Sequence, residues 1–292
     1  MAERRARPGP PSALLWAAAL VLTLGAAMFQ RLTGPTHPLP GTTEVEGQAV
    51  SWHLPRSGTA GDPLRIEIAA PRSVLGGTLR YRGYPAEERF QGFSMLRDET
   101  LLLGLLPAQP PAGKLEYYVV LATRSGLVRI PDERPVVMRF RGAVPAAVLI
   151  PHVAFLFGAM LLALRAGLEA FFARPQTRSL ARWALIGITL GGMILGPLVQ
   201  KFAFDAFWTG WPFGEDVADN LTLLAWIAWI VAVLVARAAH DPTDRFARTM
   251  VVAATVVTFA VYLVPHSLGG SELDYEKLDA GASPSEAVPT GR

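Results

Sequence analysis

The sequence predicts an α+β membrane protein, in which a multi-pass helical bundle of five spans carries an inserted extracytoplasmic β-sandwich. Composition is the first reason: 51% of the 292 residues are hydrophobic and only 17% are charged, whereas soluble domains have about 25% charged residues. The second reason is the presence of five long apolar runs. The third is a stretch of strand-like alternation between the first run and the second.

The first apolar run, Ala13–Phe29, follows three arginines within the first seven residues. A basic start before an apolar run is typical of a cleaved signal peptide or of an uncleaved signal anchor. The seventeen residues of this run exceed the apolar core of a signal peptide, which has about 7–15. We therefore predict a cytoplasmic tip and signal anchor over residues 1–30, while cleavage near Gly25-Ala26-Ala27 stays open.

Four further apolar runs predict a transmembrane domain over residues 143–266. About 20 apolar residues are needed to cross the hydrocarbon core of a bilayer. Inside lipid the backbone must form its hydrogen bonds within its own segment, so spans of this length are helices. The four runs are Pro145–Leu164, Trp183–Gln200, Leu221–Ala236 and Thr249–Pro265.

Basic residues in the connections predict the direction of the spans, because cytoplasmic loops carry an excess of Lys and Arg. Three of these residues lie on one side of the predicted membrane: Lys201, Lys277 and Arg292. Ten lie on the other side: Arg4, Arg5, Arg7, Arg165, Arg174, Arg178, Arg182, Arg237, Arg245 and Arg248. We expect a bacterial inner membrane protein with a cytoplasmic N-terminus. The β-sandwich, the loop 201–220 and a flexible tail over residues 267–292 are then extracytoplasmic.

The extracytoplasmic β-sandwich is predicted over residues 44–142, after a linker over residues 31–43 that is rich in Pro, Gly and Thr. Strict alternation of apolar and polar residues, interrupted by Gly and Pro, is typical of half-buried antiparallel strands. The predicted strands are Val50–Leu54, Leu64–Ala70, Thr78–Tyr84, Glu99–Leu105, Lys114–Thr123, Gly126–Ile130 and Val136–Arg141. Their number and length fit an immunoglobulin-like or fibronectin-like sandwich.

Several functional classes are disfavoured by composition and motifs. The chain has no cysteine, which excludes disulfides, thiolate metal sites and cysteine nucleophiles. The isoelectric point near 9.4 suggests nucleic-acid binding, but the arginines flank apolar runs, so we expect no nucleic-acid partner. H-E-x-x-H, G-x-S-x-G and P-loop motifs are missing, which disfavours an enzymatic function.

A group of histidines and carboxylates is predicted near the outer ends of the spans. His152 lies near the start of the second span and His266 at the end of the fifth, so both face the extracytoplasmic side. Two histidines from different spans are the axial ligands that a haem requires. With Glu215, Asp216 and Asp219 from the outer loop they form a candidate divalent-metal site.

The same residues have a structural interpretation. Asp219 or Asn220 is well placed to cap the fourth span, and Glu215 and Asp216 favour the positive end of that helix electrostatically. His152 in this interpretation bonds a neighbouring helix. Both alternatives stay open at the level of sequence.

The loop Lys201–Asn220 is rich in Phe and Trp, which is typical of membrane-interface anchoring; a lipid or quinone pocket is the alternative. Lys201 and Asp205 are spaced to form an ion pair on one helical turn. In the third span, Gly191-Gly192 and Gly196-Pro197 predict close helix contact or a kink.

Two functional hypotheses follow from these observations. The first is a non-catalytic accessory, assembly or scaffolding subunit that lies in the lipid bilayer and docks other envelope proteins through the β-sandwich. The second is a membrane redox or metal protein that holds haem or a divalent metal with His152 and His266.

Overall fold

The computed structural model describes residues 10–34, 36–85, 89–241, 244–264, 273, 275–283 and 287. The fold is mixed α+β and divides into two compact units. The helical unit contains the long apolar helices. The β unit contains the strands, together with residues 200–215 and the described part of the C-terminal segment.

Five helices of the described chain are long and apolar enough to cross a membrane, as the sequence predicts. The third of them is continuous through a π-helical turn, η1. The elements are α1 (Ser12–Thr33), α2 (Ala146–Phe171), α3 (Thr177–Ile188), η1 (Thr189–Leu195), α4 (Gly196–Phe204), α5 (Val217–Ala238) and α6 (Arg245–Leu263).

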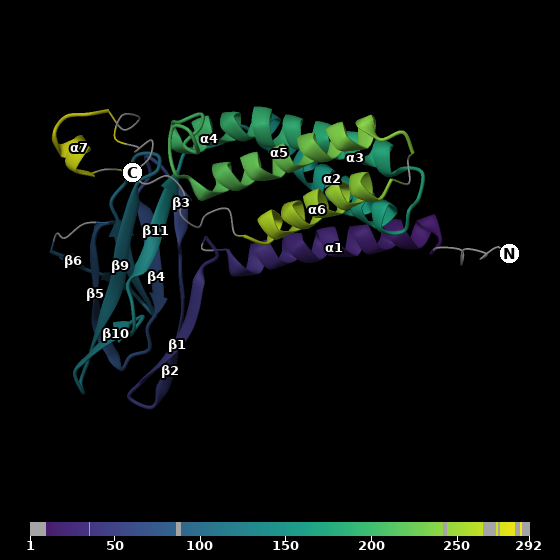
Figure 1. Ribbon diagram of the computed structural model, residues 1–292. Helices are drawn as coiled ribbons and strands as arrows, with labels where there is room; N and C mark the ends of the chain where they lie inside the picture. The colour runs from purple at the N-terminus through teal and green to yellow at the C-terminus, as the bar shows by residue number, and fades with distance from the viewer. Residues whose placement is uncertain are drawn as a thin grey trace. The chain divides into compact units, whose positions relative to one another are not determined.

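The helices pack through small residues. One side of α2 buries Ala159, Ala163, Ala166 and Ala170 against α3 and α6, in a core that also contains residues of α5. Small side chains let helix backbones approach closely, and close packing is the main attraction between helices in lipid. Helix α1 contacts α2 and lies beside α6 (Figure 1), where it contributes its own buried alanines to the packing.

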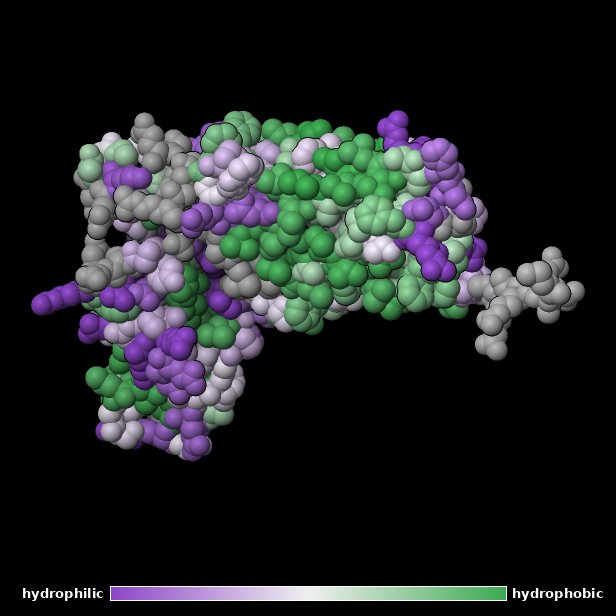
Figure 2. All heavy atoms as spheres, in the orientation of Figure 1, coloured by the Kyte–Doolittle hydropathy of each residue, from purple (hydrophilic) through white to green (hydrophobic). Residues whose placement is uncertain are grey.

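Large apolar side chains point outward from this bundle. Figure 2 shows hydrophobic residues over most of the visible surface of the helices. The most exposed include Val21, Leu24, Ile150, Leu234 and Val256. An apolar exterior around a small-residue core is the arrangement expected of helices that are solvated by lipid rather than by water.

The β unit contains three sheets. A six-stranded sheet has the order β3-β11-β9-β5-β6, with β10 pairing the far end of β9, and a three-stranded sheet has the order β4-β8-β7. Strands β1 and β2 form a hairpin. The strands are β1 (Leu39–Val45), β2 (Gln48–Leu54), β3 (Ser57–Thr59), β4 (Leu64–Ala69), β5 (Val74–Gly83), β6 (Gln91–Ser94), β7 (Leu96–Asp98), β8 (Leu101–Leu106), β9 (Lys114–Thr123), β10 (Leu127–Ile130) and β11 (Val136–Arg141).

One hydrophobic core joins these sheets. Alternate residues of β9 are buried in it, namely Leu115, Tyr117, Val119 and Leu121. They pack with core residues from the hairpin, from β4 and β8, and from β5 and β11. The Tyr117 hydroxyl donates a hydrogen bond to the Pro55 carbonyl at 2.8 Å, so this buried phenol is satisfied, and its burial raises the Tyr117 pKa.

All seven predicted strands are confirmed to within a few residues, and four others were not predicted. Strands β3, β6 and β7 are only three or four residues long, too short for a clear alternation. Strand β1 occupies residues that the sequence analysis assigns to the linker, because Pro40 and Gly41 weaken a strand pattern. Pairing with β2 overrides that local preference.

Part of the segment predicted as a flexible tail packs against the β unit. Short helix α7 (Tyr275–Asp279) places the Tyr275 hydroxyl at the first residue of β9. This hydroxyl accepts a hydrogen bond from the Lys114 backbone N–H at 2.9 Å and lies 2.8 Å from the Lys114 carbonyl. Burial raises the pKa of Tyr275 to about 12, so the phenol is neutral at physiological pH and able to donate.

Candidate functional site

His152 lies beside the π-helical turn of the third span. Its Nδ1 is 3.0 Å from the carbonyl oxygen of Gly191 in η1. A carbonyl oxygen only accepts, so Nδ1 carries the proton, and Nε2 of the neutral ring is an acceptor or a metal ligand. A π-helical turn inside a helix is frequent at functional sites, which makes this the most distinctive polar contact at the predicted outer cluster.

The glycines of η1 allow this contact. A Cβ atom on Gly191 would lie 3.0 Å from the backbone nitrogen of Leu156 in α2, and one on Gly192 would lie 2.8 Å from Cγ2 of Thr222 in α5. The close helix contact that the sequence predicts at Gly191-Gly192 is therefore present. It brings α2, η1 and α5 together around the π-helical turn.

The predicted carboxylates have local roles at the start of α5. Asp216, rather than Asp219 or Asn220, caps the helix, because its side chain accepts hydrogen bonds from the backbone N–H groups of Ala218 and Asp219 at 2.9 and 3.1 Å. Asp219 lies in the first helical turn, and Glu215 is exposed just before the cap. A carboxylate in these positions stabilises the positive end of a helix.

Within the described residues, no group of three or more His, Asp or Glu side chains is arranged to hold a metal ion. His266 lies outside the described residues, so its predicted meeting with His152 stays a prediction. The expected pair of Lys201 and Asp205 is confirmed, with 2.6 Å between Nζ and Oδ1.

Other polar side chains of the helical unit form hydrogen bonds between helices. The Trp229 indole N–H donates to the Thr258 hydroxyl at 2.7 Å, and the Thr255 hydroxyl lies 2.9 Å from the Ala163 carbonyl. The Tyr262 hydroxyl donates to the Leu156 carbonyl at 2.7 Å. In an apolar environment such groups must be satisfied internally, and these contacts connect α2, α5 and α6.

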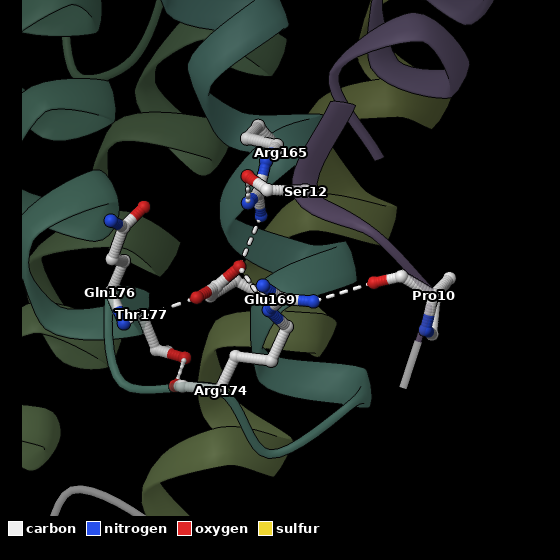
Figure 3. A network of polar contacts seen from close by, with 7 residues as sticks. All are labelled: Pro10, Ser12, Arg165, Glu169, Arg174, Gln176 and Thr177. Atoms are coloured by element: carbon white, nitrogen blue, oxygen red, sulfur yellow. Dashed lines mark hydrogen bonds and ion pairs between the residues drawn. The ribbon is translucent and has the colours of Figure 1, made fainter. Parts of the chain in front are cut away.

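A buried charge network lies where α2 ends and α1 begins (Figure 3). Arg165 and Glu169 form an ion pair on one turn of α2, and their side chains are 0% and 1% exposed. Arg174 places its Nε 3.4 Å from the same Glu169 oxygen. The other Glu169 oxygen accepts a hydrogen bond from the Gln176 backbone N–H at 3.2 Å.

Both arginines of this network also contact α1 or the residues before it. Arg165 donates to the Ser12 hydroxyl at 3.1 Å, and Arg174 donates to the Pro10 carbonyl at 2.6 Å. The network therefore fastens the start of α1 to the end of α2 and to the connection that leads into α3.

This network was not predicted from the sequence, where Arg165 and Arg174 serve only to predict orientation and Glu169 has no assigned role. The available signal is the i, i+4 spacing of Arg165 and Glu169 at the end of an apolar run. The predicted loop between the second and third spans is largely helical, because α2 continues to Phe171 and α3 begins at Thr177.

Two further arginines at this end of the helical unit bind carbonyls where other helices end. Arg248 donates to the carbonyls of Ala170 and Phe171 at 2.6 and 2.8 Å, and Arg178 donates to that of Ala239. The last carbonyls of a helix have no partner within it, and a cation there interacts favourably with the helix dipole. These arginines thus stabilise the ends of α2 and α5.

The open side of the six-stranded sheet carries a cluster that we call the arginine–aromatic face. All of its members except Phe90 alternate with core residues on β5, β9 and β10, so the strand pleat directs them away from the core. Phe90 lies just before β6 and joins the face through its ring contact with Tyr118. They are Arg80, Arg82, Phe90, Glu116, Tyr118 and Arg129.

The aromatic rings of this face hold two of the arginines. Phe90 and Tyr118 meet edge to face, with centroids 4.9 Å apart. The Arg82 guanidinium lies 4.5 Å from the Phe90 ring and that of Arg129 lies 4.2 Å from the Tyr118 ring. Cation–π contacts of this kind orient a guanidinium without neutralising its charge.

Charge on the arginine–aromatic face is unbalanced. Arg82 pairs with Glu116 on the neighbouring strand. Arg80, which lies directly opposite Tyr118 in the register, is exposed. Neither Arg80 nor Arg129 forms an ion pair with any residue that the structure describes. Among the described residues, these two positive charges of the face therefore have no carboxylate partner.

The outer side of the three-stranded sheet is different in character. Leu96 of β7 and Leu105 of β8 are 70% and 63% exposed. The neighbouring strand β4 carries the exposed ion pair of Arg65 and Glu67 at 2.7 Å. This side is mainly apolar and has no surplus of one charge among these residues.

Known proteins provide no guide to the function of this chain, which must therefore be inferred from the geometry of its residues. No protein-family model matches the chain, and no curated protein is similar to it. By its fold the chain is an α+β protein, and the five long apolar helices of its described part suggest a membrane protein.

Proposed function

We propose that this protein is an integral membrane protein that acts as a non-catalytic accessory, assembly or scaffolding subunit, and that its β unit docks other envelope proteins. The observation that carries the proposal is the arginine–aromatic face. Arg and aromatic side chains are enriched in the centres of protein–protein interfaces. The polar groups described above for the helical unit mainly connect helices, which is the role of an anchor.

The proposed orientation has the arginine-rich end of the helical unit in the cytoplasm of a bacterial cell. Arg165, Arg174, Arg178 and Arg248 all form their contacts at this end. Positive residues favour the cytoplasmic side of an inner membrane. The β unit and the start of α5 are then on the extracytoplasmic side.

Labelling of single cysteines tests this orientation, because the chain contains none of its own. Ser94 in β6 and Ser179 in α3 are both exposed. In intact spheroplasts we expect a membrane-impermeant maleimide to label Ser94→Cys, and to label Ser179→Cys only after permeabilisation. Equal labelling of both before permeabilisation, or the reverse pattern, would contradict the orientation.

We further propose that α1 is an uncleaved signal anchor. It has polar contacts with the rest of the bundle at both ends, from Ser12 to Arg165 and from Gln30 to the Tyr262 carbonyl. A signal peptide that is removed has no such contacts to maintain. Loss of α1 would leave Arg165 without its hydroxyl partner and would uncover the surface where Ala19 and Ala26 pack.

An immunoglobulin-like sandwich is the architecture that we propose for the β unit. The chain passes from β4 to β5 and β6, returns to β7 and β8, and then enters β9, β10 and β11. The resulting orders, β4-β8-β7 and β6-β5-β9-β11, correspond to the B-E-D and C′-C-F-G orders of immunoglobulin domains. Such sandwiches have many functions, so the docking proposal rests on the face and not on the fold.

Cross-linking in living cells tests the docking function. Amine-reactive cross-linking before lysis should capture one or a few envelope proteins reproducibly with the full-length chain. The control is the same reagent added after detergent solubilisation at equal protein concentration, which reports random contacts. If both samples contain only the protein itself, the docking function is wrong.

A metal or haem function is the alternative, and the orientation of His152 favours it, since Nε2 is the nitrogen left to bind a ligand. Elemental analysis of purified protein tests it. Under this alternative, stoichiometric metal is lost in His152→Ala and in His266→Ala, and is retained in the control His240→Ala. Equal metal content in all four proteins would contradict the site.

A further inference from the structure

We infer that the arginine–aromatic face binds an acidic segment on the surface of a partner protein, an inference that rests on the proposed docking function. Charge is the first argument. Arg80 and Arg129 have no carboxylate partner among the described residues, whereas Arg82 already has Glu116. Carboxylates on a partner protein would complete this face.

Geometry shows why carboxylates suit these positions. Strand β9 carries Tyr118 between Arg80 on β5 and Arg129 on β10. Neighbouring strands are about 4.8 Å apart, so the two arginine backbones are separated laterally by about two such spacings, or roughly 10 Å. Two acidic side chains on one partner segment span this separation. Tyr118 offers an aromatic surface between them.

The side chain types favour a protein partner over a phosphate polymer. The positive residues of this face are arginines, and a guanidinium binds carboxylates or phosphates through two parallel hydrogen bonds while it stacks on an aromatic ring. The choice of a protein partner therefore rests on the combination of arginine with tyrosine. Arg129 already stacks on Tyr118 at 4.2 Å, so little side-chain freedom remains to be lost on binding. Arginine and tyrosine are also among the side chains that are enriched at interface hot spots.

A photo-reactive side chain on the face tests the inference in the full-length chain in its native membrane. Benzoylphenylalanine at Thr78, which lies two residues before Arg80 on β5, should cross-link a partner protein. Peptide mapping should then place the cross-link next to Asp or Glu residues. A second protein with the same photo-reactive residue at Leu105 reports the opposite, leucine-rich side of the β unit.

Charge reversal identifies the contribution of the two arginines. Arg80→Glu with Arg129→Glu should lower the Thr78 cross-link at least about tenfold, because close charge pairs across an interface couple strongly. The matched control, Arg72→Glu with Arg124→Glu, changes net charge equally at two other exposed positions and should leave the cross-link unchanged. Equal thermal unfolding of the two variants confirms that folding is not responsible.

The remaining outcomes separate this inference from the docking function. A partner captured only from Leu105 would overturn the inference and leave the docking function intact. A Thr78 cross-link to lipid, to a phosphate polymer or to a protein segment without acidic residues would also overturn the inference. Capture of no protein from either position would contradict the inference and the docking function together.

Discussion

Replacing Glu169 by Ala should lower the free energy of unfolding by about 3–5 kcal/mol, the cost of leaving a buried charge without its partner. The Arg165 side chain is 0% exposed, so water cannot replace the lost carboxylate. Arg174 and the Gln176 backbone N–H lose the same acceptor. Unfolding in mixed micelles of a mild detergent and sodium dodecyl sulfate measures the loss.

Two comparisons make this prediction specific to burial. Glu67→Ala removes an exposed ion pair whose side chains are 54% and 50% exposed, and such pairs contribute only about 0–1 kcal/mol. Arg165→Leu combined with Glu169→Leu removes both charges at once. This double variant should recover most of the stability lost in Glu169→Ala, because no unpaired buried charge remains in α2. A Glu169→Ala loss no larger than that of Glu67→Ala would contradict the role of the network.

Replacing Gly167 by Val should also destabilise the helical unit, by about 1–3 kcal/mol as is typical of an overpacked core. A Cβ atom on Gly167 would lie 2.6 Å from both Cγ2 and Oγ1 of Thr255 in α6. The Thr255 hydroxyl lies 2.9 Å from the Ala163 carbonyl of α2 and 2.9 Å from the Val251 carbonyl of its own helix, so moving it away from Gly167 would disrupt these contacts. The two helices must therefore separate.

Gly158 in the same helix provides the control. A Cβ atom there would meet nothing within 4 Å, so Val has room at this position. Gly158→Val should leave unfolding nearly unchanged or raise stability slightly, because glycine is a poor helix former. If the two variants unfold alike, close contact between α2 and α6 is not the reason for glycine at position 167.

The two predictions concern the helical unit, and the effects of these variants should be separable from the effects of variants on the arginine–aromatic face. Glu169 and Gly167 belong to the helical unit, whereas Arg80 and Arg129 belong to the β unit. If the docking proposal is correct, the charge reversal of the arginine–aromatic face should remove a partner without altering unfolding in mixed micelles. Glu169→Ala and Gly167→Val should lower stability in mixed micelles but should keep the partner, provided that the variant protein still reaches the membrane.

Sequence reasoning predicted most of the long elements of this fold. Helix α5 can be predicted from the sequence because a span through lipid requires about twenty consecutive apolar residues, a condition that each segment must meet by itself. Strand β9 can be predicted because its residues alternate between those that face the core and those that face the open surface. Both signals are local, so no knowledge of neighbours is needed.

Features that depend on neighbours were missed or misplaced. Asp216, rather than the predicted Asp219 or Asn220, caps α5, because the end of a helix is hard to place within a few residues when several capping side chains lie in a row. The π-helical turn η1 is not visible in the sequence, although the glycines at 191 and 192 indicated close contact. The predicted meeting of His152 with His266 stays a prediction.

The sequence by itself thus determined that five helices and a strand-rich segment form, since hydropathy and alternation act within each segment. Tertiary structure alone decided which charges are buried and which remain available. Arg165 and Ser12 are 153 residues apart in the chain, and only the packing of α1 on α2 brings them together. Arg80 and Arg129 share a face only because β5 and β10 both pair with β9, and strand order is a property of the whole fold rather than of any segment.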